Sequence, residues 1–189
     1  MKSRIKELLS KRKRLKLSDP NFNHAAVFLL LFKRDGECYV LFTRRTESVK
    51  YHKGQISFPG GAFDEEDGTL LNTAFRETFE EVGLSRENIE VLGGLDDIVT
   101  FTSRYIVTPF VGFLKHQPDG SYKINKYELE EVIEVPLSVL LDERNFREEL
   151  HEYFGQTVTV YFYDYNGHII WGATAMMLKQ FLDLLKSKG

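Results

Sequence analysis

The chain has 189 residues, a formal net charge of −3 and a single cysteine, Cys38. This length suits one domain with a full hydrophobic core, and a lone cysteine excludes an intrachain disulfide and a cysteine-based zinc cluster. The longest apolar run, from Ala25 to Phe32, is far shorter than the roughly 20 residues that cross a bilayer as a helix. We therefore expect a cytoplasmic protein without a membrane span.

Residues 1–20 are predicted to form a basic N-terminal helix or arm, followed by a single domain over residues 21–189. Residues 1–17 hold eight Lys or Arg and one Glu. The positions at helical spacing are Ile5, Leu8, Leu9, Arg12 and Leu15. Such a segment can contact nucleic acid or an anionic membrane. Because no aromatic residue interleaves the basic ones, we favour packing of its leucines on the domain or on a second subunit of a homodimer.

The next elements lead to a glycine turn. The strands expected before residue 60 span about 25–33, 38–44 and 55–58, with a turn at residues 34–36. Pro59-Gly60-Gly61 ends the third strand, and its glycines let the backbone approach a bound group closely. An acidic loop follows, in which Asp67 or Thr69 can cap a helix.

That helix carries three carboxylates on one face. At about 100° of rotation per residue, Glu77, Glu80 and Glu81 fall within an arc of roughly 100°. The side expected to enter the core carries Leu71, Phe75, Phe79 and Val82. Gly83 suits a left-handed C-terminal cap. Because like charges at this spacing repel and Mg²⁺ is held by carboxylate oxygens, the pattern indicates a cation site as well as a solvated acidic face.

The remaining chain completes an α/β pattern. The expected elements are strands near 89–99 and 105–115, a strand or loop at 128–134, a short helix from 135–137, a hairpin over 153–165 with its turn at 166–167, and an amphipathic helix over 172–186. Strands enclosed by helices in this way are typical of α/β layers in one domain.

Residues 61–84 resemble the Nudix box, whose pattern is G-x5-E-x7-R-E-U-x-E-E-x-G-U with U aliphatic. The match from residue 76 to 84 is close, and only Phe79 or Thr78, where the pattern has an aliphatic residue, departs from it. The loop is one residue longer than the pattern, so that the first glutamate of the box aligns with Gly68. Asp67, one position earlier, is the expected substitute.

Residues 41–61 resemble a second signature, that of the coenzyme A pyrophosphatase subfamily, L-L-T-x-R-[SA]-x3-R-x3-G-x3-F-P-G-G. Every spacing is kept, but Phe42, Thr46 and Lys50 stand where the signature has Leu, Ser or Ala, and Arg. The resemblance covers about residues 25–185. It implies a Nudix-type α/β/α sandwich with a mixed β-sheet, and hydrolysis of coenzyme A or its derivatives to 4′-phosphopantetheine and adenosine 3′,5′-bisphosphate.

The resemblance also implies roles for individual residues. Glu77 and Glu81 are the expected ligands of Mg²⁺ or Mn²⁺, with Glu80 as a third ligand and the Gly61 carbonyl as a fourth. Arg76 is expected to pair with one of these glutamates. Water is the expected nucleophile, and its base is expected among later glutamates. The candidates for the base are Glu128, Glu130, Glu131 and Glu134, of which Glu131 is preferred.

Basic residues near the glycine turn are candidates for substrate binding. Arg44, Arg45 and Lys50 can contact the phosphates of coenzyme A, next to Gly60 and Gly61. Strand alternation turns only one of the two arginines toward the site, and the signature favours Arg45.

Two other functions stay open. The chain can be a Nudix diphosphatase for ADP-ribose, NADH or an oxidised nucleotide, which the departures from the subfamily signature permit. It can also be a non-catalytic Nudix domain that binds a ligand or RNA. Intact helix glutamates argue for catalysis, and nucleic acid is therefore not the expected partner.

Overall fold

The computed structural model describes residues 1–47, 54–100, 102–153 and 155–187, apart from the side chain of Tyr153. The helices are α1 (Lys2–Lys11), α2 (Leu70–Val82), α3 (Leu137–Leu141) and α4 (Gly172–Lys186), with single 3-10 turns η1 (Glu65–Asp67), η2 (Arg86–Asn88) and η3 (Glu143–Asn145). The strands are β1 (Asn23–Arg34), β2 (Glu37–Arg45), β3 (Ile56–Ser57), β4 (Gly60–Ala62), β5 (Ile89–Gly94), β6 (Ile98–Thr100), β7 (Tyr105–Leu114), β8 (Leu129–Pro136), β9 (Phe146–Tyr153), β10 (Gln156–Tyr165) and β11 (His168–Trp171).

A mixed sheet of eight strands, counted over the described residues, forms the centre of the molecule. Its middle strand β1 runs parallel to β7 and antiparallel to both β2 and β4. The partner of β1 changes along its length, because residues 30–34 pair with β2 whereas residues 25–27 pair with β4. This split brings the glycine turn of β4 beside the middle of the sheet.

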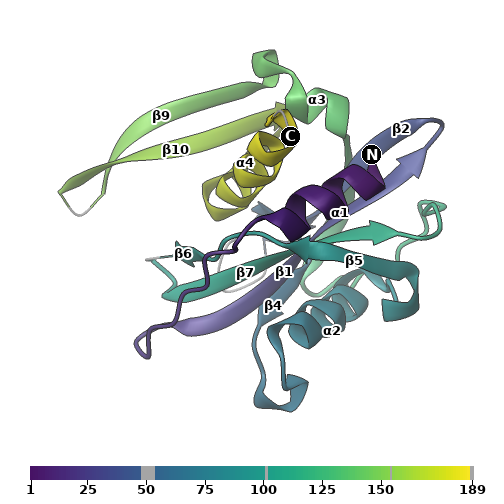
Figure 1. Cartoon of the computed structure of the whole chain (residues 1–189), viewed down its shortest axis with the longest axis horizontal. Coiled ribbons are helices and arrows are strands. Elements are labelled where there is room, and N and C mark those ends of the chain that lie inside the picture. Colours follow the sequence, from purple (N-terminus) through teal and green to yellow (C-terminus); the bar gives the residue numbers. More distant parts are fainter. Residues whose placement is uncertain (48–53, 101, 154, 188–189) are drawn as a thin grey trace.

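Helices cover both faces of this sheet (Figure 1). On one face, Phe28 and Leu41 form a core with Ala74 and Phe75 of α2. On the other face, the alternate side chains of the same strands pack with α1, α4 and the smaller sheet β11-β10-β9. The expected α/β/α sandwich with a mixed sheet is therefore confirmed.

The bounds of α2 follow from local signals at its two ends. The Thr69 hydroxyl accepts a hydrogen bond from Asn72 N–H at 3.2 Å, and Gly83 ends the helix at φ 75°. The buried face differs from the expected one by one position. Phe79 is 58% exposed, while Thr78 is fully buried in its place. The buried face of α2 is centred on Ala74, Thr78 and Val82, and Phe79 therefore points toward solvent.

Three other observed elements differ from the expected ones or decide between expected alternatives. The strand expected over 89–99 is divided into β5 and β6, because Asp96 and Asp97 leave the sheet and bind the N-terminal segment. The hairpin expected over 153–165 is instead one strand, β10, which pairs with β9 on one side and, across the turn at 166–167, with β11 on the other. Residues 129–136 form a strand and not a loop.

The basic N-terminal segment lies against the domain. Its helix ends at Lys11, so Arg12 and Leu15 belong to an extended stretch and not to the expected helix. Ile5 and Leu9 are buried. Arg12 pairs with Asp96 at 2.5 Å, and Leu17 N–H donates to Asp97 at 2.8 Å.

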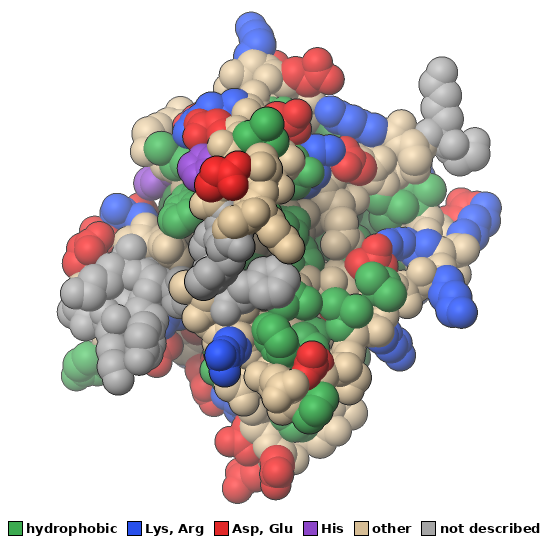
Figure 2. All heavy atoms as spheres, turned by 90° about the vertical axis from the view of Figure 1, so that its left-hand side faces the viewer, with side chains coloured by type: hydrophobic (Ala, Val, Ile, Leu, Met, Phe, Trp, Pro, Cys, Tyr) green, Lys and Arg blue, Asp and Glu red, His purple; other side chains and the backbone are tan. Residues whose placement is uncertain are grey.

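Further basic side chains of this segment bind the domain, since Lys2 pairs with Glu90 at 2.8 Å and Arg14 with Asp97 at 3.4 Å. Lys and Arg side chains are scattered over the face shown in Figure 2 and do not gather there. The ion pairs of Lys2, Arg12 and Arg14 thus attach the basic segment to the domain. A membrane-crossing helix is not found in the described part of the chain.

Candidate functional site

Glu81 is the most buried carboxylate of α2. Glu81 is only 2% exposed, and its Oε2 accepts a hydrogen bond from Gly60 N–H at 3.1 Å. Burial raises the pKa of Glu81 to about 8, and the nearby charge of Glu77 acts in the same direction. The Gly60 hydrogen bond and the charge of Arg45 oppose this shift. A carboxylate in this position gains strongly from a cation.

Glu77 lies against the backbone of β4. A Cβ atom at Gly61 would come within 2.5 Å of the Glu77 carboxyl carbon, so only glycine leaves room for this contact. Burial raises the pKa of Glu77, whereas its hydrogen bond to Arg76 lowers it. Two carboxylates, Glu77 and Glu81, thus face the two glycines of the turn.

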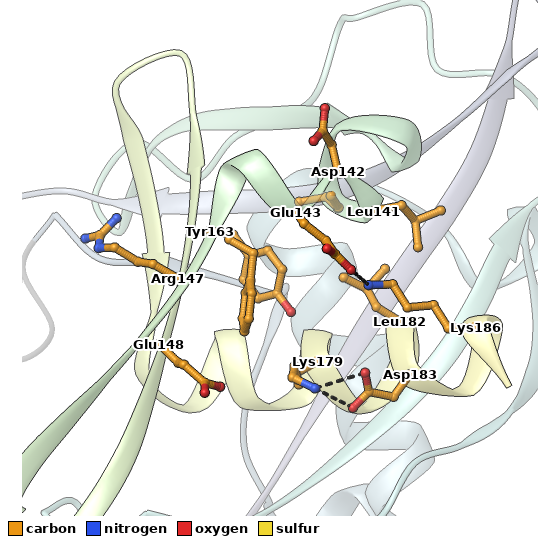
Figure 3. Close-up of a pocket in the computed structure, with 12 residues that line it drawn as sticks. Leu141, Asp142, Glu143, Arg147, Glu148, Tyr163, Lys179, Leu182, Asp183 and Lys186 are labelled. Atoms are coloured by element: carbon orange, nitrogen blue, oxygen red, sulfur yellow. Dashed lines mark hydrogen bonds and ion pairs between the residues drawn. The ribbon is translucent and has the colours of Figure 1, made fainter.

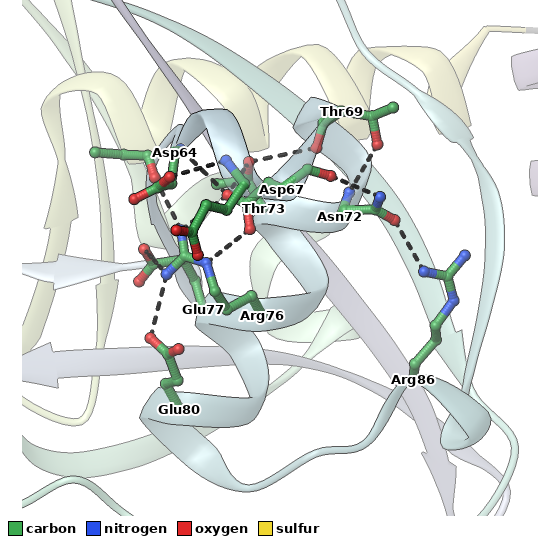
Figure 4. Close-up of polar contacts among 11 residues, drawn as sticks. Asp64, Asp67, Thr69, Asn72, Thr73, Arg76, Glu77, Glu80 and Arg86 are labelled. Carbon is green, nitrogen blue, oxygen red and sulfur yellow. Dashed lines mark hydrogen bonds and ion pairs between the residues drawn. The ribbon is translucent and has the colours of Figure 1, made fainter.

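Arg76 connects the acidic loop, the helix and β4 (Figure 4). Its Nε and Nη2 donate to the two Asp67 oxygens at 2.8 and 3.0 Å. Its Nη1 donates to Glu77 at 2.7 Å and to the more exposed Glu80 at 3.2 Å. Nη2 also donates to the Ala62 carbonyl at 3.1 Å. The guanidinium therefore holds three carboxylates and one strand in a fixed arrangement.

Asp67 occupies the place expected for the first glutamate of the box. It binds Arg76 through both oxygens, and this pairing lowers the pKa of Asp67 to about 2. Its Oδ2 also accepts from the Thr73 hydroxyl at 2.8 Å. The longer loop therefore keeps a carboxylate at this point.

The carboxylate oxygens of Glu77, Glu80 and Glu81 suit a hard divalent cation, although they do not converge on one point. Among the described residues, no three His, Cys, Asp or Glu side chains are arranged around one point as metal ligands. Glu77 and Glu80 are turned toward Arg76, and Glu81 toward Gly60. Oxygen donors beside a buried, like-charged pair nevertheless match the preference of Mg²⁺ and Mn²⁺.

The two expected substrate arginines lie in different surroundings. Arg44 shares the side of β2 that holds Phe42, and it pairs with Glu131 at 2.7 Å and Glu130 at 3.0 Å. Arg45 follows the alternation of Leu41, on the side of α2, and its charge acts on Glu81. Its Nε is buried without a hydrogen-bond partner in the described residues. Lys50 lies outside the described residues.

Glu131 and Glu128 also lie apart. Glu131 is opposite Arg44 in the pairing of β2 with β8, on the side of Ile133 and thus away from α2. The charge of Glu128, by contrast, raises the pKa of both Glu77 and Glu81. The structure therefore brings Glu128 and not Glu131 toward the helix carboxylates.

Residues 125–128 form a turn, of which the sequence analysis connected only the candidate base Glu128 to the site. Asn125 N–H donates to the Glu81 carbonyl at 3.0 Å, and Thr46 N–H donates to the Glu128 carbonyl at 2.9 Å. The turn thus links the end of α2 to the end of β2. Neither hydrophobic periodicity nor a motif signals such a contact, because it depends on two segments far apart in the chain.

A separate cavity of about 450 Å³ lies between α3, β9 and α4 (Figure 3). Tyr163, Lys179, Asp183 and Lys186 point into it. Lys179 is bound to Asp183 at 2.7 Å, and none of the expected site residues lines this cavity. It is distinct from the carboxylate site.

Comparison with known proteins gives a consistent result. The family model of the NUDIX domain matches residues 22–168. A Photorhabdus laumondii protein named "Uncharacterized Nudix hydrolase NudL" is 39% identical over 165 residues, which cover 87% of this chain and 86% of that one. "Nudix hydrolase 15, mitochondrial" of Arabidopsis thaliana is 34% identical over 82% of this chain, which spans only 55% of that protein.

A solved structure shows the same fold over most of the chain. The MutT/nudix family protein of Enterococcus faecalis superposes with a TM-score of 0.56 at 16% sequence identity. The superposition covers 94% of this chain and 67% of that one.

Glu81→Gln should make the metal-free protein more stable at alkaline pH. Because the folded pKa of Glu81 is about 8, well above the unfolded value, wild-type stability falls as pH rises from about 4.5 to 8. Glutamine keeps an oxygen for Gly60 N–H and has no charge to bury. Urea unfolding in a chelator at about pH 5 and pH 8 should show an advantage of the variant that grows with pH. Each pKa unit corresponds to about 1.4 kcal/mol. Parallel pH dependences in the two proteins would contradict the buried carboxyl.

Proposed function

This chain belongs to the NUDIX family, and we propose that it hydrolyses the diphosphate bond of coenzyme A or one of its derivatives with the aid of Mg²⁺ or Mn²⁺. The reaction releases 4′-phosphopantetheine and adenosine 3′,5′-bisphosphate. The observation that carries the proposal is a pair of carboxylates, the buried Glu81 and the partly buried Glu77, against the two glycines of β4.

Glu77 and Glu81 are the proposed metal ligands, with Glu80 and the Gly61 carbonyl completing the protein's share. Support comes from the raised pKa of Glu81, since a group that is costly to ionise alone is stabilised by a cation. A divalent ion held by these residues would supply positive charge to neutralise the diphosphate and to stabilise the charge that develops as the P–O bond breaks.

The protein's own groups orient the site. Arg76 holds Glu77 and Glu80 by charge-assisted hydrogen bonds, and its pairing with Asp67 fixes the guanidinium in turn. Gly60 N–H fixes one oxygen of Glu81. These contacts restrict the movement of Glu77, Glu80 and Glu81, which lowers the entropy cost of ordering them around a bound ion.

We propose Glu128 as the general base, in place of the Glu131 expected from the sequence. Glu128 is exposed, and its charge acts on both proposed ligands. It can therefore take a proton from a water that attacks phosphorus beside the metal. Glu131 is engaged by Arg44, which supports a structural role for that pair.

Arg45 is the proposed phosphate contact, beside Gly60 and Gly61. Its charge acts on Glu81, and a guanidinium offers a planar fork to phosphate oxygens. The sequence signature of residues 41–61 supports coenzyme A as substrate. Phe42, which departs from that signature, is fully buried and stacks on Phe58 at 4.9 Å, so this departure concerns the core and not the substrate.

The function is tested by product identification. With Mg²⁺ or Mn²⁺, coenzyme A should yield adenosine 3′,5′-bisphosphate in preference to the AMP expected from ADP-ribose or NADH, as measured by anion-exchange chromatography. Glu81→Gln should reduce turnover by about 100-fold or more, because it removes a metal ligand. Preferential release of AMP would retain the diphosphatase and reject coenzyme A. No turnover of any of the three would contradict the proposal.

Glu128→Gln and Glu131→Gln form a matched pair for the base. The first should lower kcat by about 100-fold, the usual contribution of a general base. The second should leave kcat within about twofold and cost about 1 kcal/mol of stability or less, since the Arg44 pair is partly exposed. The opposite ranking in steady-state kinetics would restore Glu131 as the base.

Arg45→Gln should raise KM by about tenfold or more, because a hydrogen bond to a charged group contributes about 1.5–3 kcal/mol. Arg44→Gln is the matched control, since its guanidinium is already bound by Glu130 and Glu131. It should leave KM nearly unchanged. Equal increases of KM in both variants would contradict the proposal that only the arginine on the α2 side of β2 contacts the phosphate.

A further inference from the structure

Tyr127 is unusually exposed for a tyrosine. Tyr127 is 90% exposed. The other tyrosines whose burial is described are partly or fully buried, namely Tyr39, Tyr105, Tyr122, Tyr161, Tyr163 and Tyr165. Tyrosine rings carry a large apolar surface that folding normally covers at least in part. An aromatic face left in water is accessible to a planar ligand.

The backbone that carries this ring is firmly held. Within the turn, Glu128 N–H and Leu129 N–H both donate to the Asn125 carbonyl, at 3.0 and 2.8 Å. Asn125 Oδ1 accepts from Tyr127 N–H at 3.2 Å, and the Thr46 hydroxyl donates to the Tyr127 carbonyl at 3.4 Å. Leu129, at the end of the turn, is buried. The ring thus projects from a fixed turn.

The turn lies beside the carboxylate site. Asn125 N–H binds the carbonyl of Glu81, a proposed metal ligand. Thr46, which holds Tyr127 from the other side, directly follows Arg45 along β2. Glu128, the next residue after Tyr127, acts electrostatically on Glu77 and Glu81. The turn that carries Tyr127 therefore lies within electrostatic range of the proposed metal ligands.

We propose that the Tyr127 ring is the stacking platform for the base of a nucleotide substrate whose diphosphate lies over Glu77 and Glu81. This inference rests on the proposed diphosphatase function and adds the recognition of the base to it. Tyr127 is then a residue that determines affinity and specificity, and it takes no part in the transfer of the phosphoryl group.

The surroundings of the ring favour a planar base over an aliphatic tail. An apolar chain is bound by a groove with several apolar walls, whereas the neighbours of Tyr127 in the chain are the charged residues Lys126 and Glu128. A base needs only one flat face, because stacking on a single aromatic ring contributes about 1–3 kcal/mol. A ring on a polar turn fits the second case.

The test compares two ligands that resist hydrolysis, α,β-methylene-ADP and methylenediphosphonate, by calorimetry in Mg²⁺. Wild type should bind the nucleotide more tightly. Tyr127→Ala should weaken its binding by about 5- to 150-fold, which corresponds to the loss of one stacking contact, and should leave methylenediphosphonate binding unchanged. Tyr127→Phe should restore the nucleotide affinity to within about twofold, because it keeps the ring.

Leu150→Ala controls for the removal of an exposed apolar side chain elsewhere, since Leu150 is 75% exposed on β9. It should bind both ligands as wild type does. Unchanged nucleotide affinity in Tyr127→Ala, or equal affinity of wild type for the two ligands, would overturn the stacking role and leave the diphosphate site standing. Failure of wild type to bind either ligand would overturn the proposed function and the stacking role together.

Discussion

One guanidinium, that of Arg76, holds the carboxylates of the site together. Asp67, Glu77 and Glu80 would repel one another without a cation between them, and Arg76 binds all three as well as the Ala62 carbonyl. It thereby joins the acidic loop and α2 to β4. The position of Glu77 against Gly61 depends on this junction, and Glu81 lies one helical turn further along the same helix.

Local signals were sufficient to predict the helix but not its surroundings. Thr69 and Gly83 mark the ends of α2 by their own chemistry, and the spacing of its glutamates is visible in the sequence. The apolar pattern of this helix fits two rotations that differ by one residue, so Phe79 was wrongly expected in the core. Strand β9 gave no alternation signal because charged residues occupy half of it, and it is defined by its backbone pairing with β10.

Which side chains meet at the site is set mainly by sheet pairing. Arg44 and Arg45 are neighbours in sequence, yet the first is engaged by β8 and the second lies toward α2. The same pairing carries Glu131 to the face opposite α2, whereas the turn before β8 brings Glu128 back toward it. A register between strands separated by about 80 residues cannot be derived from spacing within either strand.

The acidic loop shows how chain length and side-chain reach compensate for each other. Gly68 follows η1 in a left-handed conformation, with φ 67° and open space where a Cβ atom would lie, and takes up the extra residue of the loop. Asp67 still accepts hydrogen bonds from Arg76 with both oxygens, although its side chain is one methylene shorter than that of glutamate. Loop length and acid type should therefore change together among relatives. A motif written as fixed positions would score this carboxylate as lost, whereas one written as a partner of the arginine would retain it.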